Sequence, residues 1–179
     1  MYIAREDSFL LMGEVKKYAK GNVLDMGTGS AIQALAAAEK RDVDSVLAVD
    51  VDRKVVSELK KTIKDSKITI QYSDLFSKVK GKFDTIIFNP PYLPNDAEVE
   101  DRALYGGKEG YELIKKFFKN VSKYLNKDGI ILIVFSSFTG KEKVDDILIK
   151  SGFEFKELSH QHIFFEDLYV YLVQKIVKC

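Results

Sequence analysis

The strongest indication of the fold is the stretch Asn22-Val23-Leu24-Asp25-Met26-Gly27-Thr28-Gly29-Ser30-Ala31. A short apolar run ends in a turn with glycines at alternate positions, and an alanine-rich segment, 31–40, follows it. A strand that passes through a glycine-rich turn into a helix is the first unit of a parallel sheet, and its turn lets a ligand approach the backbone closely. The stretch therefore predicts an α/β protein with a ligand site at this turn.

On both sides of this stretch, short apolar runs alternate with longer amphipathic segments. We expect helices at 8–19, with Ser8 as the N-cap, and at 31–40, 53–65, 109–125 and 141–150. We expect strands at 22–25, 45–49, 67–72, 83–88 and 129–135. Two late strands, 153–158 and 168–174, have no helix between them, which predicts an antiparallel pair at the far edge of the sheet. The pattern indicates one doubly wound, mostly parallel seven-stranded sheet in a single domain, residues 1–179.

Composition narrows the possible functions. The chain has 28 Lys and Arg residues against 27 Asp and Glu residues. This balance disfavours a large sequence-independent nucleic-acid surface, although it does not exclude nucleic acid as a partner. Cys179 is the single cysteine, and His160 and His162 have no obvious third ligand nearby, so we expect no metal site. The chain has neither a signal-peptide pattern nor an uncharged apolar stretch that could span a bilayer, so we expect a cytoplasmic protein without a membrane partner.

An acidic residue follows each of the first three expected strands: Asp25, Asp50 and Asp74. Folds of this class bind ligands beyond the carboxyl ends of their strands. Asp25 would repel a pyrophosphate but suits a ligand with an ammonium group, such as S-adenosylmethionine. Asp50 can accept hydrogen bonds from both ribose hydroxyls, while Asp74 and the Leu75 amide can bind an adenine ring. Asp52 is expected to cap the next helix.

The motif Asn89-Pro90-Pro91-Tyr92 directly follows the buried strand 83–88 and holds two of the three prolines of the chain. Prolines fix the backbone and donate no hydrogen bond. The Asn89 side-chain oxygen and the Pro90 carbonyl can then both accept hydrogen bonds from one NH2 group, and Tyr92 can stack on a planar substrate. This pattern predicts a binding site for a planar amide or amine nitrogen.

With this motif the chain resembles class I methyltransferases, Rossmann-like enzymes, and among them the HemK-type glutamine methyltransferases of translation release factors. The segments 2–11 (YIAREDSFLL), 89–94 (NPPYLP) and 102–110 (RALYGGKEG) carry the resemblance. Two departures are that residues 3–5 replace the family's Glu-Pro-Ala and that Ala31 replaces the third glycine of the cofactor loop. The residues expected to contact S-adenosylmethionine are Ser8, Asp25, Gly27, Thr28, Gly29, Asp50, Val51, Asp74, Leu75 and Asn89. The expected catalytic residues are Asn89, Pro90, Pro91 and Tyr92.

The family's bacterial members carry an N-terminal helical domain that is missing here, so the chain is similar to the short archaeal and eukaryotic branch. That resemblance implies a protein substrate, the glutamine of the Gly-Gly-Gln loop of a translation release factor. It also implies a heterodimer with a small zinc-binding activator protein, which would pair with the edge strand near 67–72. An unpaired edge strand is a liability that such a partner would cover.

Three other functions are weighed against this hypothesis. An adenine or guanine amine of RNA or DNA could bind the same acceptors, with a flipped base on Tyr92. A cofactor-binding scaffold without turnover is a second alternative, which the intact motif disfavours. A nicotinamide-dependent oxidoreductase is disfavoured by Asp25 and by Ile32, which stands where a dinucleotide loop has its last glycine.

Overall fold

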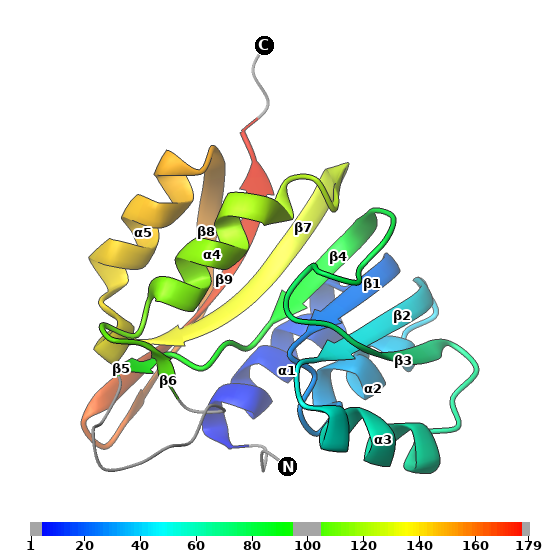
Figure 1. Ribbon diagram of the computed structural model, residues 1–179. Coiled ribbons are helices and arrows are strands. Elements are labelled where there is room, and N and C mark those ends of the chain that lie inside the picture. Colours follow the sequence, from blue (N-terminus) through cyan, green and yellow to red (C-terminus); the bar gives the residue numbers. More distant parts are fainter. Residues whose placement is uncertain (1–4, 95–104, 177–179) are drawn as a thin grey trace.

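The computed structural model describes residues 5–94 and 105–176, which form a seven-stranded sheet with helices on both faces (Figure 1). Along the chain the helices are α1 (Glu6–Tyr18), α2 (Ile32–Ala38), α3 (Arg53–Thr62), α4 (Glu112–Val121), the 3-10 helix η1 (Ser137–Thr139) and α5 (Lys141–Lys150). The sheet strands are β1 (Gly21–Met26), β2 (Val43–Asp50), β3 (Ile68–Tyr72), β4 (Phe83–Phe88), β7 (Leu125–Ser136), β8 (Phe153–Ile163) and β9 (Glu166–Lys175). A separate small pair joins β5 (Leu93–Pro94) to β6 (Tyr105–Gly107).

The strand order β3-β2-β1-β4-β7-β9-β8 confirms the doubly wound architecture. The first five strands in this order run parallel, and β9 is antiparallel to both of its neighbours. The order reverses between β1 and β4, where Met26 pairs with Phe88. Gly27 and Asn89 therefore leave adjacent strands at the same level, in the crevice where folds of this class bind ligands.

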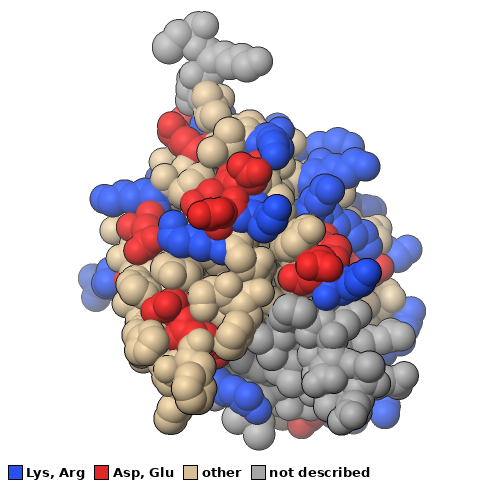
Figure 2. Space-filling model, turned by 90° about the vertical axis from the view of Figure 1, so that its left-hand side faces the viewer, with Lys and Arg blue, Asp and Glu red and all other residues tan. Residues whose placement is uncertain are grey.

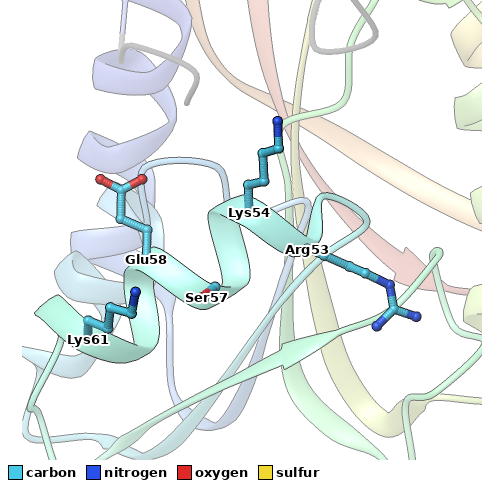
Figure 3. A pocket seen from close by; sticks show the side chains of 5 residues that line it. All are labelled: Arg53, Lys54, Ser57, Glu58 and Lys61. Atoms are coloured by element: carbon cyan, nitrogen blue, oxygen red, sulfur yellow. The ribbon is translucent and has the colours of Figure 1, made fainter.

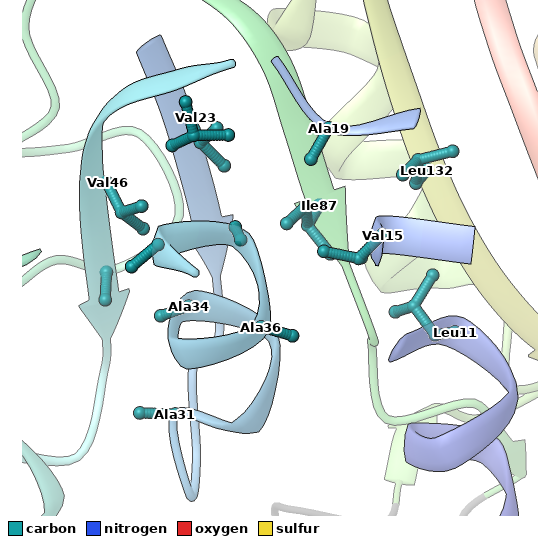
Figure 4. Packing of buried hydrophobic residues seen from close by; sticks show 14 of the residues in the cluster. Leu11, Val15, Ala19, Val23, Ala31, Ala34, Ala36, Val46, Ile87 and Leu132 are labelled. Carbon is teal, nitrogen blue, oxygen red and sulfur yellow. The ribbon is translucent and has the colours of Figure 1, made fainter. Parts of the chain in front are cut away.

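Alternation along the buried strands gives two separate cores. In β7, Ile130, Leu132 and Val134 face the core under α1, α2 and α3, shown in part in Figure 4. Ile131, Ile133 and Phe135 face the other core, under α4 and α5. Because successive side chains of a strand point to opposite faces, a strand covered on both sides must be apolar throughout.

Helix α4 is anchored to the second core by aromatic residues. Phe117 is fully buried, and its ring centroid lies 4.3 Å from that of Phe88, 5.1 Å from Phe118 and 5.3 Å from Phe76. Aromatic pairs at such distances add to the free energy gained from burial alone. This contact holds α4 against the strand that carries the Asn-Pro-Pro-Tyr motif.

Several expected boundaries are corrected. Helix α1 begins at Glu6, so Ser8 is a buried residue of its first turn and not the N-cap, which is Arg5. The acidic pair Glu6 and Asp7 favours this start because it faces the positive end of the helix dipole. Helices α2, α3 and α4 are shorter than expected, whereas β7 and both late strands are longer.

The apolar stretch 164–172 lies only partly in the sheet core. Leu168, Val170 and Tyr171 are buried, but Phe164 and Phe165 form the exposed turn between β8 and β9. Apolar character alone does not reveal a hairpin turn when the turn lacks glycine, asparagine and proline.

Candidate functional site

The glycine-rich turn after β1 has a backbone that side chains disfavour. Gly27 and Gly29 have φ angles of 69° and 53°, and Ala31 has a φ of 63°. A Cβ added at Gly27 would meet no atom within 4 Å, so neighbouring protein atoms do not fill the space beside it. The turn therefore offers an open backbone surface, as a loop that is approached by a ligand requires.

Asp25 organises this turn from beneath. Its Oδ2 accepts hydrogen bonds from Thr28 Oγ1 at 2.6 Å and from the Ala34 amide at 3.2 Å. The side chain is 1% exposed. Burial raises the pKa of Asp25 to about 7, although the hydrogen bonds from Thr28 and Ala34 act in the opposite direction. Asp25 thus shapes the loop through the same carboxylate that was expected to face a cationic ligand.

Asp50, at the end of β2, links two loops of the site. Its Oδ2 accepts a hydrogen bond from the Gly29 amide at 2.9 Å, and its Oδ1 accepts one from the Asp52 amide at 2.8 Å. A carboxylate has about four acceptor positions, so further hydroxyl donors can still bind. Asp52 caps α3 as predicted, because its Oδ1 accepts from the Lys54 amide at 2.7 Å.

The segments after β2 and β3 continue the site away from Asn89. Val51 is an exposed apolar side chain directly after Asp50, which suits contact with an aromatic ring. Leu75 has a positive φ of 44°, so its backbone follows a left-handed turn. Asp74 is exposed and its Oδ1 lies 3.7 Å from Lys116 Nζ, a surface ion pair that leaves the carboxylate accessible.

Asn89 is held from α1. Its Nδ2 donates to Asp7 Oδ2 at 3.1 Å and to Ser8 Oγ at 3.2 Å. An ionised carboxylate can only accept, so Asp7 turns the nitrogen of the Asn89 amide toward itself. Asn89 Oδ1 is buried and has no hydrogen-bond partner in the described part of the chain. A buried acceptor without a partner is costly, and a ligand N–H would satisfy it.

Sequence reasoning missed two residues that support Asn89. Asp7 is one, and Gln33 is the other, because its Nε2 donates to the Ser8 carbonyl oxygen at 2.8 Å. Asp7 and Asn89 lie 82 positions apart, so no local pattern joins them. The available signal was that Asp7 lies inside the family-like segment 2–11.

The rest of the motif is tied to the end of β7. Thr139 Oγ1, in η1, donates to the Tyr92 carbonyl oxygen at 3.1 Å. Pro90 is buried, and Pro91 and Tyr92 are partly exposed. The glycine-rich turn, Asp50 and the Asn-Pro-Pro-Tyr motif thus share one end of the sheet. Residues 2–4 and 102–104 of the family-like segments lie outside the described residues.

Two surface hollows lie away from this site. One, of about 450 Å³, runs along the outer side of α3 and is lined by Arg53, Lys54, Ser57, Glu58 and Lys61 (Figure 3). The other, of about 520 Å³, includes Gly21, Asp84 and Asn126 at the opposite end of the sheet. Neither includes a residue of the Asn-Pro-Pro-Tyr motif. Among the described residues, no group of His, Cys, Asp and Glu is arranged to hold a metal ion, and no helix could cross a membrane.

Comparisons with known proteins identify the family to which this chain belongs. Residues 6–165 match the model of the methyltransferase small domain. A Methanocaldococcus jannaschii protein assigned as an N5-glutamine methyltransferase is 34% identical over 95% of this chain and 89% of its own length. A release factor glutamine methyltransferase of Streptococcus pneumoniae is 30% identical, and the match covers 63% of this chain and 44% of that protein.

Solved structures show the same fold. The Mtq2–Trm112 complex of E. cuniculi, described as responsible for methylation of the eRF1 translation termination factor, contains a chain with a TM-score of 0.76 at 21% identity. The match covers 97% of this chain and 98% of that one. The chain described here belongs to the methyltransferase small domain family, where its high-coverage archaeal relative is assigned as a glutamine methyltransferase.

Proposed function

We propose that the chain transfers a methyl group from S-adenosylmethionine to the side-chain amide nitrogen of a glutamine, in the Gly-Gly-Gln loop of a translation release factor. The observation that carries the proposal is Asn89, whose nitrogen is held by Asp7 and Ser8 while its buried oxygen has no partner. That oxygen is the acceptor that an incoming amide N–H needs. The assignments of the archaeal and streptococcal relatives point to the same substrate class.

The residues present fit the cofactor. The open backbone beside Gly27 and the buried, unpartnered Ser30 Oγ leave a place for a polar ligand at the glycine-rich turn. Asp50 would hold the ribose hydroxyls, and Val51, Asp74 and Leu75 would bind the adenine ring. Ser8 and Asn89 complete the site on the side of the substrate. When bound, S-adenosylmethionine supplies an electrophilic methyl group on a sulfonium.

In the proposed mechanism, Asn89 Oδ1 and the Pro90 carbonyl accept the two hydrogens of the glutamine amide. With S-adenosylmethionine bound, this would aim the nitrogen at the methyl group, so that an N–C bond could replace the C–S bond. The amide lone pair is normally delocalised into the carbonyl, so acceptors that favour a rehybridised nitrogen lower the barrier. One amide proton then leaves to water, which balances the charge of the sulfonium that is lost.

Transfer of tritium from labelled S-adenosylmethionine tests this substrate. A release factor with its Gly-Gly-Gln loop intact should become labelled, and the same protein with Gly-Gly-Ala should not. Equal labelling of the two proteins would refute glutamine as the acceptor. An absence of any labelling, with the cofactor bound and a Trm112-type protein present, would refute the release factor as the substrate.

We also infer that a small partner protein pairs with β3, and that the resulting heterodimer acts in the cytoplasm, where release factors work. Within the described residues, strand β3 lies at one edge of the sheet and pairs with β2 alone. The Lys67 carbonyl accepts from the Val46 amide and the Ser73 amide donates to the Asp50 carbonyl, so the odd-numbered residues face β2. The even-numbered residues direct their backbone groups away from β2. The Ile68 amide donates to the Asp65 carbonyl within the chain, so Ile70 offers the outward amide at the middle of the strand.

The partner interface is tested by comparing Ile70→Pro with Ile70→Ala. Proline removes an outward amide that β2 does not use, and alanine is the matched control because it also shortens the side chain but keeps the N–H. Co-purification with a Trm112-type protein should be lost in Ile70→Pro and kept in Ile70→Ala. Equal binding of both variants would refute pairing through this edge.

A further inference from the structure

The turn between β8 and β9 carries two exposed phenylalanines. Phe164 and Phe165 are 91% and 92% exposed, more than any other large hydrophobic side chain in the described residues. They are the two residues between the paired positions Ile163 and Glu166. Large adjacent aromatic side chains in water are typical of a surface that binds another molecule.

The backbone at this turn is unfavourable for phenylalanine. Phe164 has a φ of 46°, in the left-handed region, whereas Phe165 does not. A two-residue hairpin with a positive φ only at its first position resembles a type II′ turn, which favours glycine there. A bulky residue that keeps such a conformation carries strain, and strain of this kind gathers at functional positions.

The base of the hairpin is fixed beside the candidate active site. Ser136 Oγ donates to Glu166 Oε2 at 2.5 Å, and the Asp167 amide donates to Ser137 Oγ at 3.0 Å. These serines adjoin η1, whose Thr139 bonds the carbonyl oxygen of Tyr92. The phenylalanines thus lie at the end of the sheet that holds the Asn-Pro-Pro-Tyr motif, connected to the motif by a short series of hydrogen bonds.

Polar side chains surround this apolar tip. His160 Nε2 and His162 Nδ1 lie 2.8 Å and 3.0 Å from Asp167 Oδ1, and the His160 ring stacks on Tyr169. The pKa of Asp167 is lowered by its hydrogen bonds to the two histidines. In Figure 2, the described atoms at the lower left of this face are mostly tan and lie below one red patch, at the height of the β8–β9 turn in Figure 1. An apolar centre with a polar rim is the usual anatomy of a protein interface.

We propose that Phe164 and Phe165 are a docking element for the folded protein substrate, and that they insert into an apolar pocket on its surface beside the methyl-acceptor loop. The proposal rests on the proposed function. The substrate is the favoured occupant because the tip stands on the same end of the sheet as the acceptor motif. The edge strand β3, the inferred surface for the small partner, lies at the opposite edge of the sheet from β8.

Steady-state kinetics with two acceptors tests this element. One acceptor is a whole release factor, and the other is a synthetic peptide of its Gly-Gly-Gln loop. In the double variant Phe164→Asn, Phe165→Ser, KM for the whole protein should rise on the order of tenfold or more, as expected for a lost aromatic anchor. The kcat for the whole protein and both constants for the peptide should stay within about twofold, because the tip does not touch the reacting atoms.

Two further variants sharpen the result. Phe165→Ser alone leaves the strained residue Phe164 unchanged and should also raise KM for the whole protein. Ile149→Ser, which alters an exposed apolar residue of α5, is the matched control and should change neither acceptor's kinetics. The docking proposal would be overturned if KM for the whole protein did not change in the double variant. It would also be overturned if catalytic efficiency fell equally for the whole protein and for the peptide. Failure of the unsubstituted chain, with its Trm112-type partner present, to methylate either acceptor would refute the proposed function as well.

Discussion

At the scale of single residues, Asn89 depends on α1 for its orientation. The motif around Asn89 can be identified in the sequence because it is contiguous and follows an apolar strand. The hydrogen bond that orients Asn89 cannot be identified in this way, since Asp7 accepts it from the first turn of a helix 82 positions away. Asp25 and Asp50 were predicted at the site, but the hydrogen bonds through which they hold the loop depend on the folded backbone.

Replacement of Asn89 by alanine should strongly reduce methyl transfer, while most of the cofactor affinity persists through the other residues of the cofactor site. The variant removes the buried acceptor, and loss of one such preorganised group costs on the order of 100-fold or more in kcat. Single-turnover transfer and calorimetric titration with S-adenosylmethionine measure the two properties separately. Turnover near that of the unsubstituted enzyme would contradict the role given to Asn89.

Asp7 should act as a positioning residue. In Asp7→Ala the Asn89 amide loses its fixed nitrogen partner, so we expect kcat to fall about tenfold, an order of magnitude typical of misplaced catalytic groups. Asp7→Asn keeps an acceptor oxygen and should restore most of the rate. If both variants turn over equally, the carboxylate does not orient Asn89 through that hydrogen bond.

Asp25 should make the stability of the fold depend on pH. Its pKa is raised from 3.8 to about 7 in the folded state, so the native chain binds the proton more tightly than the unfolded chain does. The stabilisation is complete below about pH 4 and is lost as the pH rises through 7, by up to about 4 kcal/mol.

Asp25→Asn is the matched variant for this pH dependence, because both donors bond the same oxygen, Oδ2, which an amide oxygen can replace. Urea denaturation between pH 4 and pH 8 should show a shallower decline in the free energy of unfolding for the variant. Parallel curves for the two proteins would show that Asp25 does not titrate in this range.

At the scale of elements, the alternation of strands and helices is predictable because it follows from apolar periodicity, but the lengths of the elements are not. Strand β7 starts at Leu125 because Leu125 pairs with Phe83 across a register shift, which no sequence window reveals. The β8–β9 turn was also missed, because its central residues are two phenylalanines. The ends of these strands and the position of the turn are set by pairing with distant strands.

Helix α4 should be the element most sensitive to truncation of one side chain. Phe117→Ala leaves a cavity among Phe76, Phe88 and Phe118 and should lower the free energy of unfolding by about 3–5 kcal/mol. Chemical denaturation measures this loss. Phe9→Ala, at an exposed residue of α1, is the comparison and should change stability little. A loss below about 1 kcal/mol for Phe117→Ala would mean that the core closes around the gap.

At the scale of the whole molecule, the sheet places three functions in separate regions. The point of strand reversal between β1 and β4 brings the glycine-rich turn and the Asn-Pro-Pro-Tyr motif together. Edge strand β3 is the surface inferred for a small partner, and the β8–β9 tip is the surface inferred for the substrate. The activity can be predicted from the family resemblance, whereas the surface at the β8–β9 tip can be inferred only from the fold.

The proposed activity is best tested by mass spectrometry of a release factor after incubation with this chain, a Trm112-type partner and S-adenosylmethionine. We expect a gain of one methyl group, mapped by fragmentation to the side-chain nitrogen of the glutamine in the Gly-Gly-Gln loop. A release factor of unchanged mass, with the cofactor shown to be bound, or a methyl group mapped to another residue, would contradict it.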